Sequence, residues 1–338
     1  MSVQSWLKRA ENLFSKRALA LCYHRIDETA VDPWELAVSP KNFAEQLQVL
    51  QAYRVLPTTQ VIRNQRDQVL PTKSICLTFD DGYVDNATLA KPLLERYETP
   101  ACFFIATGYT DRQELFWWDE LAMILLQTES LPRTLQLSIG NENQTYSLEE
   151  SHKLDQEQKQ HHRRWVYTEA PPTERCRIYL QLWDQLRAME EGAIRAAMKQ
   201  IRQWARFDPH LEEKSFPMKK AQVQDFTTHP LFELGMHTVS HCNLSVQPAE
   251  KQRHEIGLCK TSLEKDYGIS ATMLSYPYGK YNKDTIGILA ELKLAGGFTT
   301  CGEAITHQSN PYQLGRLVVK NWNGEMFEKQ LRFWFHYS

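Results

Sequence analysis

The sequence Ser74-Ile75-Cys76-Leu77-Thr78-Phe79-Asp80-Asp81-Gly82 decides the fold, because an apolar run ends abruptly in two carboxylates and a glycine. A short apolar run that stops at turn residues is typical of a buried strand. A helical pattern over residues 88–97 and a second apolar run, Ala101–Ile105, follow it. A strand, a helix and a strand at this spacing form a βαβ unit, which predicts an α/β protein with a parallel sheet covered by helices.

The same alternation continues outward on both sides of this unit. Strands are expected at residues 18–23, 232–237, 273–276, 298–300 and 317–319, and helices at residues 42–51, 250–267 and 284–294. The pattern changes in the middle of the chain. Alternating residues around Gly140 predict a β-hairpin over 135–148, and helical periodicity over 171–201 predicts two helices with a break at Gly192.

Composition excludes several classes of protein. The 338 residues carry 39 Lys+Arg against 41 Asp+Glu, a formal net charge of -2, so the chain lacks the basic field that bulk nucleic-acid binding needs. No apolar run approaches the length of about 18 residues that is typical of a membrane span. We therefore predict no nucleic-acid partner and no transmembrane segment.

The N-terminus and the cysteines bear on cellular location. The first 25 residues lack the layout of a signal peptide, and the seven cysteines are an odd number without a C-x-x-C pair, as is usual for reduced thiols. Together these features predict a cytoplasmic protein. A short amphipathic stripe fits either peripheral contact with a membrane or docking on the core, and it consists of Trp6, Leu7, Ala10, Leu13 and Phe14.

Two adjacent carboxylates, Asp80 and Asp81, directly follow the first strand quoted above. The carboxyl end of a parallel strand is where α/β sheets and barrels place their active sites. Like charges this close repel each other, so keeping both ionised favours a bound cation, and one carboxylate can then act as a base. Taken alone, Asp-Asp-Gly is also an ordinary strand-to-turn sequence.

Two further motifs follow predicted strands. His237 and His241 have an H-x₃-H spacing, which brings two imidazoles together on one face of a helical turn or in a loop. Two histidines and one aspartate form a facial triad that leaves coordination positions for water and substrate. The segment Ser275-Tyr276-Pro277-Tyr278-Gly279 is a turn that can aim a backbone N–H into a site while a tyrosine ring lines it. Taken singly, these motifs are also compatible with two unrelated histidines and a bare turn.

Together and in this order, T-F-D-D-G (Thr78 to Gly82), H-T-V-S-H (His237 to His241) and S-Y-P-Y-G (Ser275 to Gly279) resemble the motifs of polysaccharide deacetylases with a NodB-homology domain. The resemblance covers most of residues 18–118 and 226–320. It implies a distorted (β/α) barrel and a divalent metal cofactor, usually zinc.

The resemblance also implies a role for each motif residue. Asp81, His237 and His241 would bind the metal, and Asp80 would be the general base. A metal in such a site lowers the pKa of its bound water from ~15.7 to about 7, and that water attacks an amide carbonyl. The metal and the backbone N–H of Tyr278 would stabilise the oxyanion that develops. An amine leaves poorly unless it is protonated, so a general acid is also needed.

The sequence departs from the commoner pattern of this family. Ser275 stands where an Arg usually begins the third motif, and neither the usual D-x-x-D-W segment nor the late L-x-H that supplies the acid is visible. The branch that deacetylates exopolysaccharides such as poly-N-acetylglucosamine is more similar, because its acid is a histidine in an early Tyr-His segment. We therefore predict His24 as the acid, with His307 as its rival. Arg316 either orients Asp80 in place of the missing Arg or is an ordinary residue at the start of a strand.

The chain is longer than typical family members between the first two motifs. Between the last Asp of the first motif and the first His of the second lie 155 residues. We predict a single catalytic domain over residues 1–338, with its core at 18–113 and 220–338 and a mainly helical insertion, hairpin plus helices, at 114–219. The insertion would cap the site, bind a partner or form a dimer, and the sequence does not fix the oligomeric state.

Three side chains near these segments have alternative roles. Trp117 and Trp118 either line the sugar site, where aromatic faces stack on pyranose rings, or pack in a core. Cys242 adjoins His241 and is a weaker candidate for a thiolate ligand, because hydrolysis needs three ligands and an open position for water.

The function expected from these observations is that of a carbohydrate N-deacetylase. It would remove N-acetyl groups from an amino-sugar-containing glycan or glycan precursor, and that N-acetylated carbohydrate would be its partner. A cytoplasmic location favours precursors made in the cell. The alternatives are a non-catalytic sugar-binding or assembly protein on the same fold, which would have no use for both a base and a full set of metal ligands, and a hydrolase of another amide such as a formamide or an imide.

Overall fold

The computed structural model describes residues 16–110, 112, 114–140, 142–208 and 215–337. The chain forms two compact units. The first comprises the described residues of Met1–Glu28, Leu36–Arg112 and Pro217–Ser338, and the second those of Thr29–Glu35 and Gln113–Phe216. The second unit thus contains most of the expected insertion, together with a short early segment that the sequence did not assign to it. The amphipathic stripe at residues 6–14 lies outside the described residues.

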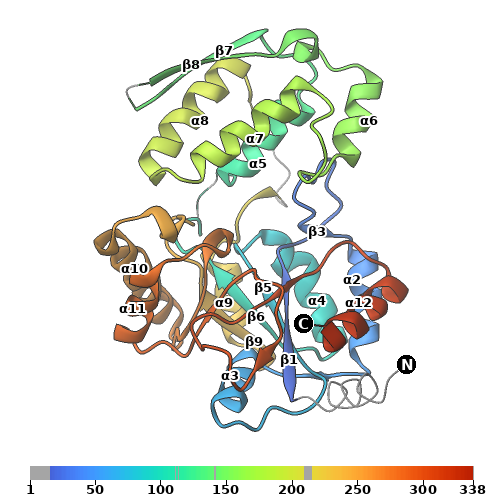
Figure 1. Cartoon of the computed structure of the whole chain (residues 1–338), viewed down its shortest axis with the longest axis vertical. Coiled ribbons are helices and arrows are strands. Elements are labelled where there is room, and N and C mark those ends of the chain that lie inside the picture. The colour runs from blue at the N-terminus through green and yellow to red at the C-terminus, as the bar shows by residue number, and fades with distance from the viewer. Residues whose placement is uncertain (1–15, 111, 113, 141, 209–214, 338) are drawn as a thin grey trace, which may run out of the picture. The chain divides into compact units, whose positions relative to one another are not determined.

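The first unit is built on a nine-stranded sheet (Figure 1). The strand order is β11-β10-β9-β6-β5-β1-β12, and in addition β4 pairs with β5 and β13 with β1. The pairings are parallel except that between β1 and β12. The strands are β1 (Arg17–Tyr23), β4 (Arg54–Val55), β5 (Ser74–Phe79), β6 (Ala101–Ile105), β9 (Phe232–Met236), β10 (Met273–Ser275), β11 (Gly296–Phe298), β12 (Ile305–Thr306) and β13 (Leu317–Val318).

The sheet of the first unit curves into a distorted barrel. Leu314 connects its two ends, because it forms a parallel bridge with Phe298 of β11 and lies just before Leu317, the first residue of β13, which pairs with β1. Backbone hydrogen bonds support this closure, from Leu314 N to Gly297 O (2.9 Å) and from Thr299 N to Leu314 O (2.8 Å). The arrangement agrees with the α/β class and distorted (β/α) barrel expected from the sequence.

Alternation along the strands sorts their side chains into two layers. In β1, odd-numbered residues such as Leu19 pack in one cluster with Phe43 of α2 (Pro40–Leu50), whereas Ala20 belongs to a second cluster inside the barrel. The same parity holds in β5, where Ile75, Leu77 and Phe79 join the first cluster and Cys76 the second. Even-numbered residues of β1 and β5 therefore face the interior of the barrel, and we expect the same of even-numbered residues just beyond the strand ends.

Helices complete the first unit. They are α2, α3 (Thr58–Arg66), α4 (Lys91–Arg96), α9 (Lys220–Thr227), α10 (Ala249–Tyr267), α11 (Lys283–Glu291) and α12 (Gly324–Tyr337), and the short parallel pair β2 (Arg25–Ile26) and β3 (Ala37–Val38) lies beside them in the sequence. Local signals set several helix ends. The Ser39 side chain accepts a hydrogen bond from Asn42 N (3.2 Å) at the start of α2, with Pro40 in its first turn, and Gly268, at φ 69°, ends α10.

Several elements differ from the sequence prediction. The helix expected at 88–97 is a π-helical turn, Asn86–Ala90, that continues into α4. The helices α3, α9 and α12 were not predicted. The two helices expected over 171–201 are present, but the break between them lies at residues 187–190 and not at Gly192. α7 (Glu174–Leu186) ends earlier, and Gly192 lies in the first turn of α8 (Glu191–Ala205), where the loss of a side chain costs the helix little.

The second unit contains a hairpin and helices, as its sequence pattern predicted. Beyond α7 and α8 its elements are α5 (Trp117–Ala122), the π-helical turn Met123–Gln127, β7 (Thr134–Ile139), β8 (Glu142–Ser147), the 3₁₀ turn Glu149–His152 and α6 (Gln156–Arg164). Trp34 ties the early segment to this unit, since its indole N–H donates to the Tyr179 hydroxyl (2.8 Å) and its ring packs on that of Trp183. Trp117 and Trp118 are buried and in contact with each other, which agrees with their interpretation as core residues.

The fully buried Arg175 organises the loops of the second unit. Its guanidinium donates to backbone carbonyls in two separate stretches of the chain, Leu125 and Thr128 in the first and Ser151 and His152 in the second. Burial lowers the pKa of Arg175 to about 10, so the side chain is charged at neutral pH.

Among the helices of the described residues, none is long and apolar enough to cross a membrane.

Candidate active site

The candidate active site forms where strands of the barrel end. Asp80 follows β5, His237 follows β9, Ser275 ends β10 and Arg316 precedes β13. Each of these residues neighbours an outward-packing residue (Phe79, Met236, Leu274 and Leu317), so strand alternation turns all four toward the interior of the barrel. The sequence therefore brings residues from four distant segments to one place through a simple parity rule.

Asp81, His237 and His241 converge on one point. The Nε2 atoms of both imidazoles lie 3.1 Å from Oδ1 of Asp81, and all three side chains are buried, with 4%, 2% and 6% of their residue surfaces exposed respectively. The H-x₃-H segment is a loop and not a helical turn, because Thr238 (φ 63°) and His241 (φ 54°) fold the backbone back on itself. The first two sequence motifs thus meet as expected.

The tautomer of His237 is fixed by the backbone. Its Nδ1 lies 2.9 Å from the carbonyl oxygen of Ser275, which can only accept a hydrogen bond, so Nδ1 carries the proton and Nε2 presents a lone pair to Asp81. The carboxylate oxygen also presents lone pairs. Such atoms repel each other at 3.1 Å unless a cation or an added proton lies among them. The buried donor set of two imidazoles and one carboxylate therefore fits a divalent metal ion.

Electrostatics in this group follow from burial and from the mutual charges. Burial by itself would raise the pKa of the Asp81 carboxyl, but His241 and His237 outweigh it and hold the pKa well below its usual value. Burial would lower the pKa of His237, yet the carboxylates of Asp80 and Asp81 raise it. At His241 burial dominates and the pKa is lowered, which favours the neutral imidazole that a metal ligand requires.

Asp80 is held by a buried arginine. The two Nη atoms of Arg316 donate to the two carboxylate oxygens at 2.8 and 2.6 Å, and the Ser275 hydroxyl donates to Oδ2 at 2.9 Å. Burial would raise the pKa of Asp80, but the Arg316 guanidinium outweighs it and lowers the pKa to about 2. Arg316 is itself fixed by Oγ1 of Thr78 (3.1 Å), the first residue of the first motif, and by the Thr299 carbonyl (3.0 Å), and the sequence analysis gave neither residue a role.

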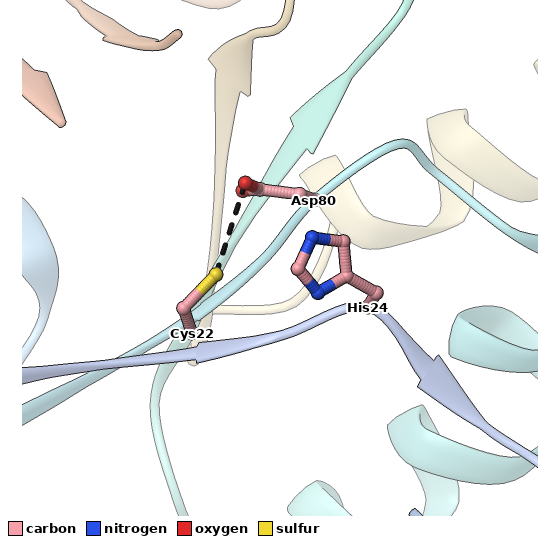
Figure 2. Close-up of side chains that lie close together, drawn as sticks. All are labelled: Cys22, His24 and Asp80. Atoms are coloured by element: carbon pink, nitrogen blue, oxygen red, sulfur yellow. Dashed lines mark hydrogen bonds between the residues drawn. The ribbon is translucent and has the colours of Figure 1, made fainter. Parts of the chain in front are cut away.

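Cys22, His24 and Asp80 form a second group (Figure 2), and Asp80 directly precedes Asp81 of the first group in the chain. Their donor atoms lie within 4.8 Å of one another, and Cys22 Sγ is 3.8 Å from Asp80 Oδ2. This group is a poor metal site for two reasons. Arg316 already neutralises Asp80, and burial raises the pKa of the Cys22 thiol, so that it stays protonated and cannot serve as a thiolate ligand.

His24 and its rival lie at opposite ends of β1. His24 directly follows the last residue of the strand, next to Asp80. His307 follows Thr306, which pairs with Arg17 at the first residue of β1, and its side chain is exposed. A strand of seven residues spans roughly 20 Å, so the structure brings His24 and not His307 near Asp80.

The backbone around His24 is clamped by residues that the sequence analysis missed. Asn86 Nδ2 donates to the His24 carbonyl (2.8 Å), and Asp85 accepts hydrogen bonds from Ile26 N (3.1 Å) and from Arg25 Nε (3.0 Å). Asp85 and Asn86 are fully buried. The signal available in the sequence was their position, since these two adjacent polar residues begin three residues beyond Gly82, at the start of a helical segment.

Tyr278 and Cys242 border the first group. Tyr278 has a left-handed backbone (φ 58°), and its ring lies edge-on to His241, with centroids 4.6 Å apart. Gly279 is required after it, because a Cβ there would lie 2.1 Å from Thr300 Oγ1. Cys242 belongs to neither group of candidate ligands found among the described residues, and burial raises the pKa of its thiol.

Comparison with known proteins identifies the family. The model of the family described as polysaccharide deacetylase matches residues 67–166 and 182–297, which is more than half of the chain. The chain belongs to the polysaccharide deacetylase family. The resemblance drawn from the three motifs is thereby confirmed.

Curated relatives support the exopolysaccharide branch of this family. A poly-beta-1,6-N-acetyl-D-glucosamine N-deacetylase of Staphylococcus aureus (strain MRSA252) is 25% identical over 141 residues, covering 38% of this chain and 48% of the relative. A putative polysaccharide deacetylase of Bacillus subtilis, YxkH, is 24% identical over 102 residues, covering 30% of this chain and 36% of the relative. The matched part of the chain thus spans about half the length of the first of these relatives, and less of the second.

Solved structures confirm the fold. The deacetylase PplD of Streptococcus pyogenes, in complex with acetate, superimposes with a TM-score of 0.59 at 18% identity, covering 94% of this chain and 98% of the other. IcaB from Ammonifex degensii superimposes with a TM-score of 0.59 at 16% identity, covering 95% and 98%. The predicted distorted barrel is therefore the fold of this protein.

Proposed function

We propose that this protein is a metal-dependent N-deacetylase that hydrolyses the N-acetyl groups of an amino-sugar glycan of the exopolysaccharide type. The observation that carries the proposal is the convergence of His237 and His241 on Asp81 beside a second carboxylate, Asp80, that an arginine holds. The family and the names of the relatives support the same chemistry. A divalent cation, zinc in this proposal, would be held by Asp81, His237 and His241, and would supply the Lewis acidity that acidifies water and polarises the acetyl carbonyl.

Asp80 acts as the general base in this proposal. Its low pKa keeps it ionised at neutral pH, so it is always in the form that accepts a proton from the attacking water. The paired hydrogen bonds from Arg316 fix the plane of the carboxylate, and the Ser275 hydroxyl fixes Oδ2 from another side. Arg316 is thus proposed to orient the base, in place of the Arg that the commoner pattern has at position 275.

His24 acts as the general acid. Once water has added to the acetyl carbon, the C–N bond breaks only if the departing nitrogen gains a proton. His24 lies within the group that contains Asp80, so the two side chains are close enough to act on the same amide bond, Asp80 on the attacking water and His24 on the departing nitrogen. The products are acetate and a free amine on the sugar. The backbone N–H of Tyr278, next to His241, is proposed to stabilise the oxyanion.

The substrate and the location are proposed at a coarser level. The named activity of the Staphylococcus relative makes a β-1,6-linked N-acetylglucosamine chain, or a precursor of one, the first substrate to test. A cytoplasmic location stays a prediction from the sequence. All seven cysteines are free, and one of them, Cys301, is exposed. Exposed and unpaired thiols are typical of reducing compartments, which supports this location.

Metal analysis and acetate release test the proposal together. The purified chain is expected to hold one equivalent of zinc and to release acetate from N-acetylglucosamine oligomers. Asp80→Asn should keep the metal and lose about 10²–10⁴-fold in turnover, which is the usual contribution of general acid–base catalysis. A chain that binds zinc and the oligomer without releasing acetate would instead be the sugar-binding protein, and release only from small formamides or imides would identify the other amidohydrolase.

A further inference from the structure

The loop that carries the two candidate histidine ligands has a backbone conformation that its own residues do not favour. His237 and His241 are separated by only three residues, and two positions of the loop, Thr238 and His241, have left-handed backbones without being glycine. Such conformations are costly for residues with a Cβ and persist only when the surroundings impose them. The residues that impose them therefore decide whether the two imidazoles can point at the same atom.

Glu255 of α10 contacts this loop directly. Its Oε2 accepts hydrogen bonds from Val239 N (3.0 Å) and Ser240 N (2.9 Å), and its Oε1 accepts one from Ser240 Oγ (2.9 Å). Only 2% of the residue surface is exposed. Two successive backbone N–H groups that point the same way form an anion-binding concavity, and a carboxylate is the group that fills it. The half-buried Lys251, one helical turn earlier, lies 3.4 Å from Oε1.

The opposite side of the loop rests on the end of β6. Thr107 N donates to the Thr238 carbonyl (3.2 Å) and Gly108 N to the Val239 carbonyl (2.8 Å). Gly108 permits this approach, because a Cβ there would lie 2.6 Å from the Val239 oxygen. The loop is therefore held between the segment after β6, whose N–H groups donate to its carbonyls, and Glu255, whose carboxylate accepts from its N–H groups.

We propose that Glu255 is a positioning residue for the metal centre, holding the loop in the shape that aims both Nε2 atoms at Asp81. The inference rests on the proposed function, since it concerns the metal ligands named there. Residues 239 and 240, which Glu255 binds, lie between the two ligands. A shift of these residues changes the distance between the imidazoles and leaves the strands of the barrel in place.

Zinc affinity is the decisive measurement. The full-length chain, stripped of metal, is titrated with zinc in competition with a chromophoric chelator. Glu255→Met keeps the buried volume but offers no acceptor, and we expect it to bind zinc 10- to 100-fold more weakly, the range usual for the loss of a group that orients metal ligands. Glu255→Gln keeps one acceptor oxygen and should fall between this variant and the wild type. Lys251→Met, the matched control, should bind like the wild type.

Amide hydrogen exchange of the metal-free proteins keeps the two proposals apart. The peptide that contains Val239 and Ser240 should exchange faster in Glu255→Met, while the strands of the barrel keep their protection. A wild type that binds no zinc would end the metal-dependent mechanism, and the exchange of this peptide would then decide on Glu255 alone.

Unchanged zinc affinity or unchanged loop exchange in a folded Glu255→Met protein overturns the inference. If that variant does not fold, Glu255→Gln takes its place: weaker zinc binding together with faster exchange supports the inference, and a value equal to that of the wild type in either measurement overturns it. Gly108→Ala, which pushes the same loop from the other side with Glu255 intact, should also weaken zinc binding.

Discussion

Replacing Arg316 by Met should strongly destabilise the first unit, because it leaves Asp80 charged, buried and without its partner. Lowering the pKa of Asp80 from its usual 3.8 to about 2 corresponds to roughly 2 kcal/mol in favour of the ionised form, even after the cost of burial. Removing Arg316 loses this stabilisation of the ionised carboxylate, and the free-energy cost of burying the charge is then no longer offset. We therefore expect a loss of about 3–5 kcal/mol in the free energy of unfolding, as is usual when one partner of a buried pair is removed.

The assay is urea unfolding of the metal-free proteins at pH 7, followed by circular dichroism. Asp80→Asn should also destabilise, because it leaves the Arg316 guanidinium buried without a counter-charge. The double variant Asp80→Asn/Arg316→Met should be more stable than the sum of the two single losses, since no unpaired charge is left. A loss below about 1 kcal/mol for Arg316→Met, or simple additivity in the double variant, would refute the reasoning.

The same pair predicts the direction of a pH effect. The pKa of Asp80 is lower in the folded than in the unfolded chain, so its contribution to stability is present above the unfolded value near 4 and is lost as the pH falls toward about 2. The stability difference between wild type and Arg316→Met should therefore narrow over that range. A difference that widens on acidification would show that another group dominates.

Three further predictions concern the acid, the metal and the second unit. His24→Ala should lower acetate release by about 10²–10⁴-fold while His307→Ala leaves it unchanged, and near-normal turnover of the His24 variant would remove it as the acid. Chelation with EDTA should abolish acetate release and lower the free energy of unfolding by about 3 kcal/mol relative to protein with zinc at 100 times its Kd, whereas equal stability with and without zinc would count against the site. Arg175→Met should destabilise the second unit by several kcal/mol, because it leaves buried carbonyls without donors, and an early unfolding step with unchanged zinc affinity is the expected signature.

The barrel and the candidate ligands could be predicted because their signals are local. Each strand is a short apolar run, and the period-2 alternation that buries Leu77 and Phe79 against the helices also turns Asp80 inward. The H-x₃-H and Asp-Asp pairs sit directly after such runs. The sequence left open whether the two histidines lie on a helical turn or in a loop, because the left-handed backbone at Thr238 depends on contacts with segments far away in the chain.

The elements that were missed depend on distant partners. α3 begins after Pro57 without a capping side chain of its own, and its first N–H, that of Thr58, is satisfied by Glu233 of β9 at 2.7 Å. No local sequence pattern predicts a capping residue that lies 175 positions away in the chain. Glu255 is hidden in the same way, since on α10 it looks like any glutamate of a charged helix. By contrast, α12 did carry a local signal, with Phe327 and Leu331 buried four residues apart.

Ser275 and Arg316 hold the Asp80 carboxylate together. The Ser275 hydroxyl donates to Asp80 Oδ2 (2.9 Å) and at the same time lies 2.8 Å from Nη2 of Arg316, which donates to it, and a hydroxyl can do both. A guanidinium at position 275 would put a second positive charge within hydrogen-bonding distance of the first, at two fully buried positions. Arginines at both positions would therefore repel each other across one carboxylate. The hydrogen bonds of Arg316 and Ser275 to the same carboxylate support a role for Arg316 in orienting Asp80 over that of an ordinary residue at a strand start.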